Sequence, residues 1–166
     1  MKTKPEILLS SKNPILFKKI LISGSDESFM LLVKEHIIND FKKRNFFIDV
    51  SNNYNGNIMG NLFSEKKTLF VLSDFPKNKE QEYYNSHDQS ILVASPNGKK
   101  TNLIKSMLAK NKESLVIECY SMDRISKENT LKNYIENNNL KLSNDVFWYI
   151  IENFDNKYVI FIKQLQ

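Results

Sequence analysis

Short apolar runs alternate with segments of helical periodicity along the first two thirds of the chain. The apolar runs predict strands at 16–22, 46–50, 68–72, 90–94 and 115–119. Apolar runs of this length, separated by helical segments, are typical of a parallel sheet covered on both faces. The pattern therefore predicts an α/β domain with a five-stranded parallel sheet and helices on both of its faces.

The helix after the first strand has the clearest signals. Ser25 is the expected N-cap, and the acidic Asp26 and Glu27 suit the positive end of the helix dipole. Its apolar positions follow helical spacing at Phe29, Leu32, Val33, Ile37 and Phe41. Weaker patterns predict helices at 58–63, 79–85 and 102–110, the last with Leu103, Met107 and Leu108 on its buried face.

The pattern changes near residue 121. Residues 126–137 have helical spacing, and Ser143 is a suitable N-cap for a helix that contains Val146, Phe147, Ile150 and Ile151. The segment 158–162 is rich in β-branched and aromatic residues, which favour a strand. A third helix of a small bundle suits its length equally, and we expect the helix. We predict an α/β domain at 1–121 and a small helical domain at 122–166.

The net charge of +5 permits a nucleic-acid partner without specifying one. Of 24 basic residues only Arg44 and Arg124 are Arg, and Arg is the residue suited to bidentate phosphate contacts. A nucleic-acid-binding module that uses the lysines of the fourth helical region is one alternative function. A solvated helix face is the expected interpretation of those residues, which are Lys99, Lys100, Lys105, Lys110 and Lys112.

Cys119 is the only cysteine, so the sequence has no disulfide framework, and a reducing cytoplasm is expected. Because the thiol lies in an apolar run, we expect a buried structural side chain. No apolar stretch approaches the length of a membrane span, and Ile7-Leu8-Leu9 is too short for a signal peptide. We therefore expect a soluble cytoplasmic protein with no membrane partner.

The turn after the first strand lacks the residues of a phosphate loop. Gly24 is its only glycine, and the sequence has no Lys between Lys19 and Lys34. Asp26 and Glu27 occupy the position of a phosphate and would repel it. We therefore expect no nucleotide cofactor, which counts against the second alternative, a divergent nucleotide-dependent ATPase or kinase.

No other pattern predicts a catalytic or metal site. Asp74 stands alone after the third strand and is expected to be a turn residue. Ser95, after the fourth strand, resembles a γ-phosphate sensor but would have nothing to sense. His36 and His87 are isolated, so packing or solvation is expected for both.

The stretch from Met59 to Leu72 combines an apolar pair with a polar break. Leu62 and Phe63 precede Ser64-Glu65-Lys66-Lys67, and the predicted strand 68–72 follows. Such a pair either packs in the core or protrudes as an anchor for a partner, where large apolar side chains dominate binding energy. Met59, one turn earlier, is the expected apolar neighbour.

Three patterns, in this order, resemble the delta subunits of bacterial DNA polymerase III, which are clamp-loader subunits of the AAA+ class. The first is the strand and acidic turn at 20–27. The second is Leu62-Phe63, the polar spacer and the strand that ends at Leu72. The third runs from Val116-Ile117-Glu118-Cys119 through Ser121 and Asp123 to Ile135 and then to Leu140-Lys141-Leu142-Ser143. Together these patterns span most of the chain.

The resemblance implies an AAA+-like domain with a degenerate phosphate loop, followed by a helical lid domain. It further implies a protein that binds and opens the sliding clamp (beta subunit) without hydrolysing ATP, as a subunit of the polymerase holoenzyme, a nucleotidyltransferase. Leu62 and Phe63, with Met59, would insert into the clamp. Burial of a Leu and a Phe is worth roughly 3–6 kcal/mol.

Delta subunits are longer and end in a helical collar that joins the other loader subunits. The present sequence does not contain that collar, so we expect a fragment or a truncated form. Contact with primer-template DNA would then be indirect. The resemblance implies no catalytic residue, no metal and no cofactor in this chain.

Overall fold

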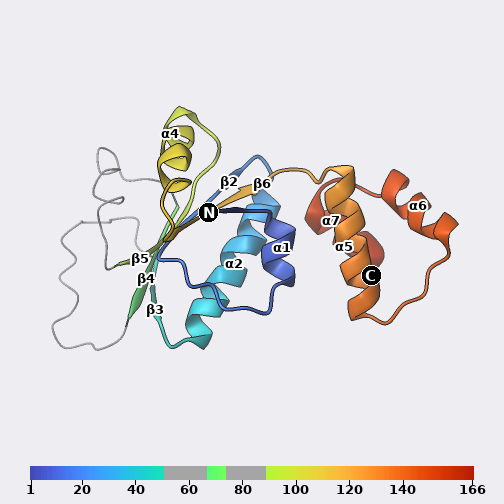
Figure 1. Ribbon diagram of the computed structural model, residues 1–166, viewed down its shortest axis with the longest axis horizontal. Coiled ribbons are helices and arrows are strands. Elements are labelled where there is room, and N and C mark those ends of the chain that lie inside the picture. Colours follow the sequence, from blue (N-terminus) through green and yellow to red (C-terminus); the bar gives the residue numbers. More distant parts are fainter. Residues whose placement is uncertain (51–66, 74–88) are drawn as a thin grey trace.

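A computed structural model describes residues 1–50, 67–73 and 89–166 of the chain (Figure 1). The elements of its first part are β1 (Lys2–Thr3), α1 (Pro5–Ser10), β2 (Lys19–Gly24), α2 (Glu27–Lys43), β3 (Phe47–Asp49), β4 (Thr68–Leu72), β5 (Ser90–Ala94), α4 (Lys99–Leu108) and β6 (Ser114–Cys119). Three helices follow, α5 (Arg124–Asn137), α6 (Asn144–Asn153) and α7 (Tyr158–Leu165). The alternation of strands and helices confirms the α/β class.

The strands form one sheet in the order β1-β6-β2-β5-β4-β3, and all neighbouring pairs are parallel. In the part of the chain that the structure describes, the sheet has six strands, so the prediction of five was wrong. The additional strand is β1, which pairs with β6 through Lys2 opposite Val116 and Thr3 opposite Ile117. Two residues are too short to give a periodic signal, and Pro5 begins a short helix directly afterwards.

Apolar side chains fill both faces of the sheet, as expected for a covered parallel sheet. On one face, Ile20 and Ile22 of β2 pack with Phe29, Val33 and Ile37 of α2. On the other face, Leu21 of β2 packs with Ile104 and Leu108 of α4. Figure 1 shows α2 and α4 on opposite sides of the strands.

The predicted boundaries agree best with the observed ones where polar residues lie on both sides of the apolar run. β4 and β5 begin and end where the sequence predicts. β2 begins at Lys19 rather than at Leu16, whose side chain is 76% exposed. In α4, Leu108 is buried as predicted and Met107 is half-buried, but Leu103 is 64% exposed and Ile104 takes the buried position instead. The predicted helices at 58–63 and 79–85 lie outside the described residues.

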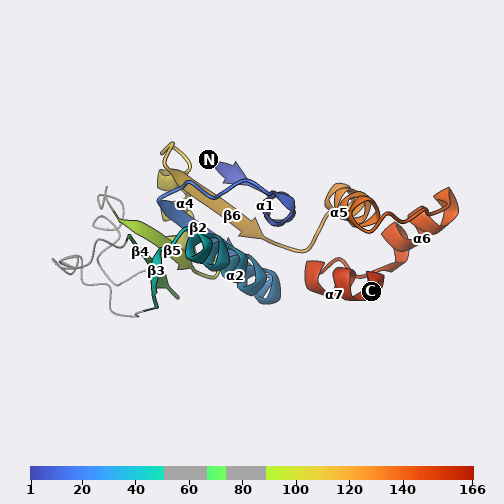
Figure 2. The same cartoon turned by 90° about the horizontal axis from the view of Figure 1, so that it is seen from below.

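The three C-terminal helices pack around a cluster of their own, which contains Met122, Leu131, Ile150, Ile151 and Phe161. The hydroxyl of Ser143 accepts a hydrogen bond from the Val146 N–H, as predicted for the N-cap of α6. The segment 158–165 is helical, so the expected third helix is confirmed. Figure 2 shows the three helices gathered beyond the end of β6.

An aromatic contact joins these helices to the α/β part. The Tyr158 ring of α7 stacks on Phe29 of α2 with centroids 4.4 Å apart and planes 2° from parallel. Next to it, the Met122 N–H donates to the Asn156 carbonyl at 2.7 Å. These contacts fix α7 over the first turn of α2, close to the turn where a nucleotide-binding α/β protein holds phosphate.

Candidate functional site

The turn between β2 and α2 makes a close backbone contact with the end of β6. Gly24 has a φ of +155°, and a Cβ at this position would lie 1.9 Å from the Cys119 carbonyl oxygen. Only glycine allows both this conformation and this approach. The single glycine of the turn therefore lets the chain pack against β6.

The backbone donors of this turn are already engaged. The N–H groups of Ser25 and Asp26 donate to the Cys119 carbonyl at 3.1 and 3.2 Å. The Asp26 side chain accepts from the Phe29 N–H at 3.0 Å and caps α2. Asp26 is thus the N-cap, and the prediction of Ser25 was wrong because α2 begins at Glu27, directly after Asp26.

The position of Asp26 decides the electrostatics of the turn. The residue is buried, and its carboxylate lies at the N-terminus of α2, where the helix dipole would otherwise attract an anion. Its Oδ2 atom has no hydrogen-bond partner among the described residues. A phosphate would meet this carboxylate in place of free N–H groups, so the geometry argues against triphosphate binding at this turn.

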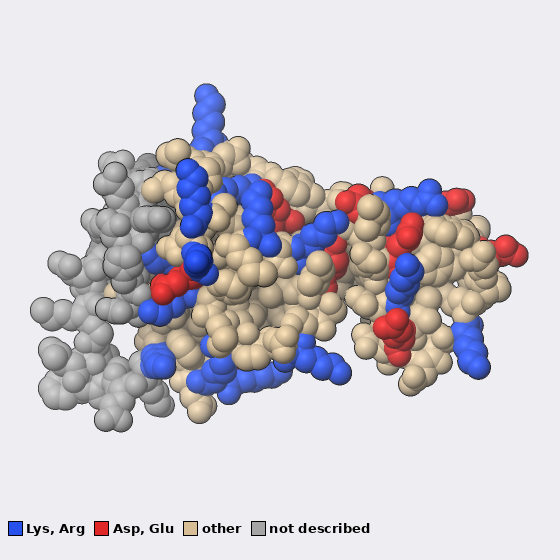
Figure 3. Space-filling view, viewed as in Figure 1, with Lys and Arg blue, Asp and Glu red and all other residues tan. Residues whose placement is uncertain are grey.

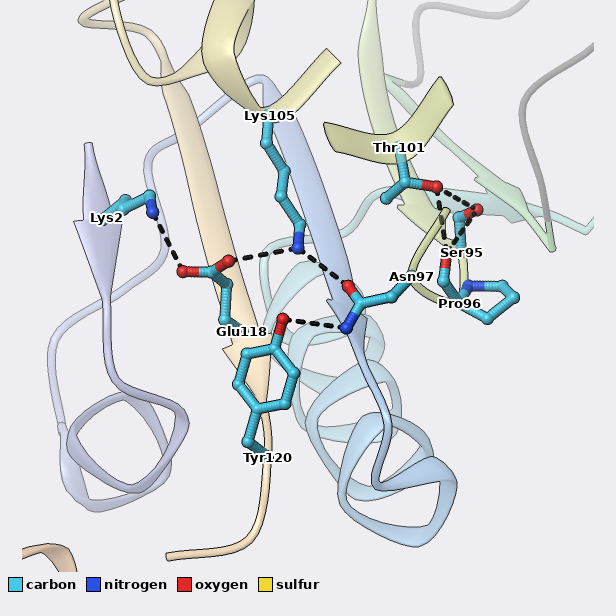
Figure 4. Close-up of polar contacts among 8 residues, drawn as sticks. All are labelled: Lys2, Ser95, Pro96, Asn97, Thr101, Lys105, Glu118 and Tyr120. Atoms are coloured by element: carbon cyan, nitrogen blue, oxygen red, sulfur yellow. Dashed lines mark hydrogen bonds and ion pairs between the residues drawn. The ribbon is translucent and has the colours of Figure 1, made fainter. Parts of the chain in front are cut away.

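A polar network lies beside the turn, at the carboxyl ends of β5 and β6 (Figure 4). Lys105 of α4 is buried, and its ammonium lies 3.1 Å from Glu118 Oε1 and 2.9 Å from Asn97 Oδ1. The Asn97 amide donates to the Tyr120 hydroxyl at 2.8 Å, and Lys2 pairs with Glu118 Oε2 at 3.0 Å. The network thus connects α4, β6 and the edge strand β1.

This network corrects the expectation of a solvated lysine face on α4. Lys99, Lys100, Lys110 and Lys112 are exposed, but Lys105 points inward to Glu118. Burial has the largest single effect and would raise the pKa of Glu118, but the hydrogen bonds and charges of Lys2 and Lys105 together outweigh it and lower the pKa. The buried face of α4 consists of Thr101, Ile104, Lys105 and Leu108, which follow helical spacing. This spacing could have identified Lys105 as a lysine that points inward.

Ser95 follows β5 at the position where we compared it to a γ-phosphate sensor. Its side chain is buried, and its hydroxyl lies 3.2 Å from the Thr101 hydroxyl, which donates to the Pro96 carbonyl at 2.9 Å. Figure 4 shows this pair turned toward the start of α4. Ser95 therefore contributes to the packing of the β5–α4 connection.

The Cys119 thiol is fully buried, in agreement with a structural role. Burial, with smaller contributions from the carboxylates of Asp26 and Glu6, raises its pKa from 9.0 to about 12. A thiolate is therefore scarce in the folded chain at neutral pH, and nucleophilic chemistry is not expected.

The raised pKa of Cys119 predicts a loss of stability in alkali. Between pH 9 and about 12 the unfolded chain releases the thiol proton while the folded chain retains it. The free energy of unfolding should then fall by about 1.4 kcal/mol per pH unit through this group. Urea unfolding at several pH values should show a shallower slope for Cys119→Ala. Parallel slopes for the two proteins would contradict the prediction.

The remaining polar candidates form no site in the part of the chain that the structure describes. His36 is half-buried on α2, while Asp74 and His87 lie outside the described residues. Within residues 1–50, 67–73 and 89–166, no group of three or more His, Cys, Asp or Glu side chains could hold a metal ion. None of the helices described there has the length and apolar character to cross a membrane.

The predicted clamp-binding residues Met59, Leu62 and Phe63 lie outside the described residues. Before these residues, the described part of the chain reaches Val50, just after β3. After them it begins again at Lys67, directly before β4. Their role therefore stays a prediction from the sequence.

No protein-family model matches this chain, and no curated protein matches its sequence. Solved structures do match its fold. The AMPPCP-bound DnaA from Aquifex aeolicus aligns over 95% of the chain with a TM-score of 0.53 and 18% identity. The replication initiator DnaA bound to AMPPCP and single-stranded DNA aligns over 96% with a TM-score of 0.50 and 18% identity.

The chain spans 57% of the length of each of these two DnaA chains. Identity this low leaves the similarity as one of fold. The parallel sheet, the helices on its two faces and the helices that follow it match the neighbours along nearly the whole chain. The chain therefore shares the fold of these two DnaA chains, and the turn between its β2 and α2 is closed by Asp26 and Cys119.

Proposed function

We propose that this chain is a nucleotide-independent AAA+ subunit that binds and opens a sliding clamp in DNA replication, as delta subunits do. The observation that supports it most is the closed β2–α2 turn in an otherwise intact AAA+ fold. An AAA+ domain that cannot use nucleotide is expected to act through its contacts with partners. The fold is shared with replication initiators, which agrees with a role in replication.

The anchor of the proposed contact is Leu62 and Phe63, with Met59 beside them. They belong to the sequence that connects β3 to β4, in the same order as the matching pair of the delta subunits. The helices α5, α6 and α7 would be the lid domain. Other clamp-loader subunits would join through a helical collar, and primer-template DNA would be contacted through them.

Clamp opening needs no chemistry in this chain. A subunit that binds the open ring more tightly than the closed ring shifts the equilibrium between them by that difference in affinity. The energy of ATP would enter through other subunits of the assembly. The proposed interaction should therefore be the same with and without Mg–ATP.

The test is binding of the full chain to the sliding clamp of its own organism by surface plasmon resonance. The double variant Leu62→Ala/Phe63→Ala should bind at least about 100-fold more weakly, because two buried apolar anchors are lost. Met59→Ala should lose about tenfold. A matched control, Leu103→Ala/Ile125→Ala, removes two exposed apolar side chains of α4 and α5 and should bind as the unmodified chain does.

Three results would contradict the proposal. Unfolding of Leu62→Ala/Phe63→Ala, seen by circular dichroism, would place the pair in the core. Failure of the well-folded unmodified chain to bind the clamp would remove the function itself. Binding that requires Mg–ATP would instead show that the closed turn does not exclude nucleotide.

A further inference from the structure

Basic side chains gather at the amino ends of the strands, opposite to the closed turn. Because the strands are parallel, the segments that lead into them lie side by side at one end of the sheet. The register places the first residues of neighbouring strands opposite one another: Lys19 with Ile91 and Ser114, Leu69 with Ser90, and Phe47 with Thr68. We call this end of the sheet the basic rim. Its cationic residues are Lys18, Lys42, Lys43, Arg44, Lys67, Lys110 and Lys112.

The rim is built by backbone hydrogen bonds between these connections. The Lys18 N–H donates to the Glu113 carbonyl at 3.2 Å, and the Lys18 carbonyl accepts from the Ile91 N–H at 2.7 Å. The Phe47 N–H donates to the Lys67 carbonyl at 2.9 Å. The rim lysines come from separate parts of the sequence, so their convergence follows from the fold and no linear motif announces it.

The balance of charge differs between the two ends of the sheet. At the carboxyl end, Lys2 and Lys105 pair with Glu118, and Lys4 pairs with Asp123. At the rim, the described acidic residues are Glu113 and Asp40, and Asp40 pairs with Arg44 at 2.9 Å. Figure 3 shows many basic side chains over the α/β part, with a few acidic ones among them.

A pocket of about 400 Å³ opens on the rim. Its lining includes the cations Lys18, Arg44 and Lys67 and the aromatic rings of Phe17, Phe41 and Phe46. The Arg44 guanidinium lies 4.2 Å from the Phe41 ring centroid and donates to the Ile15 carbonyl at 2.7 Å, which fixes its position. The volume lies in the range of small-ligand sites, and the lining combines positive charge with apolar surface.

Two large apolar side chains are also exposed at the rim, Leu16 in the lining of the pocket and Phe47 outside that lining. Leu16 is 76% exposed and Phe47, on the edge strand β3, is 60% exposed. Exposed apolar surface next to cations indicates a ligand that carries both phosphate and flat apolar groups. A single strand of nucleic acid presents both, whereas a duplex keeps its base faces stacked inside.

We propose that the basic rim is a binding surface for single-stranded nucleic acid. Lys18 and Lys67 contact phosphates, and bases lie against Phe47 and the apolar lining of the pocket, in which Arg44 is held by Asp40 and the Ile15 carbonyl. Because the cations are mostly lysines, which act as point charges, binding is independent of sequence. The proposal does not depend on the clamp proposal, since Leu62 and Phe63 take no part in it.

The test is fluorescence anisotropy of the full chain with a labelled oligodeoxythymidine of about 20 nucleotides, a length that covers several binding-site sizes. Lys18→Gln/Lys67→Gln should weaken binding about tenfold at low salt and reduce the salt slope by about 1.4, for two lost phosphate contacts. The matched control is Lys132→Gln/Lys141→Gln, which removes two exposed lysines of the helical part and should leave the affinity unchanged.

Phe47→Thr separates base contacts from charge, because threonine keeps the strand preference and removes the ring. It should weaken the oligodeoxythymidine at least about threefold and leave a duplex competitor unaffected. Any of four results would overturn the proposal. These are no binding at low salt, an equal effect of the rim and control variants, a duplex bound as tightly as the single strand, and displacement of the oligonucleotide by polyglutamate at equal charge, which would indicate an acidic protein partner.

Discussion

Gly24→Ala is expected to destabilise the fold by about 4 kcal/mol or more, the range reached only when a special backbone conformation or the core is disrupted. The new methyl group would lie 1.9 Å from the Cys119 carbonyl oxygen and 2.6 Å from its carbonyl carbon. Both atoms belong to the backbone of β6, so no side chain can rotate to make room. The φ of +155° adds conformational strain for any residue with a Cβ.

Gly98→Ala is the matched control for this prediction. Gly98 has an extended backbone at the N-cap of α4, and a Cβ there meets nothing within 4 Å. Alanine is a poorer N-cap than glycine, so a loss below about 1 kcal/mol is expected. Urea unfolding of the three proteins gives both values. Equal stability of Gly24→Ala and Gly98→Ala would mean that the β2–α2 turn does not approach β6 as described.

The same contact links stability to the proposed function. A phosphate loop needs N–H groups that face the ligand, and here the Cys119 carbonyl accepts those of Ser25 and Asp26. These N–H groups bind β6 and are not available to a phosphate, so the turn connects the end of β2 to the end of β6. A turn closed in this way suits a protein that acts through contacts with its partners and does not use nucleotide, which is the role that we propose.

The sequence predicts this turn only in part. Its composition, with one glycine, no lysine and two acids, is enough to argue against a phosphate loop. The means of closure depends on Cys119, about a hundred residues away in sequence, and local patterns carry no information on such a contact. Ser25 was expected to cap α2 because the local sequence does not show that the helix begins at Glu27, which makes Asp26 the N-cap.

The helices and strands show the same difference between features that the local sequence determines and features that tertiary contacts determine. β4 and β5 are bounded by polar residues and end where predicted. The segment 158–165 has the composition of a strand, yet it is helical because Tyr158 and Phe161 pack against α2 and the cluster of the three helices. The basic rim was not predicted, because its lysines are brought together only by the order of the strands.

A buried lysine holds the C-terminal helices together, and this gives the second large prediction. Lys127 of α5 is 3% exposed, and its ammonium donates to the carbonyls of Ile151 at 2.6 Å and Phe154 at 2.7 Å. These carbonyls lie at the end of α6, where a helix leaves its last C=O groups without partners and its dipole favours a cation. Lys127 thus joins α5 to the end of α6.

Lys127→Met should lower the free energy of unfolding by about 3 kcal/mol, because methionine preserves the volume but cannot donate to either carbonyl. Lys132→Met, an exposed position on the same helix, is the control and should change stability by less than about 0.5 kcal/mol. Urea unfolding followed by the fluorescence of Trp148 on α6 reports on these helices directly. If Lys127→Met proved as stable as Lys132→Met, the cap would be dispensable, and the packing around Phe161 alone would hold α5, α6 and α7 together.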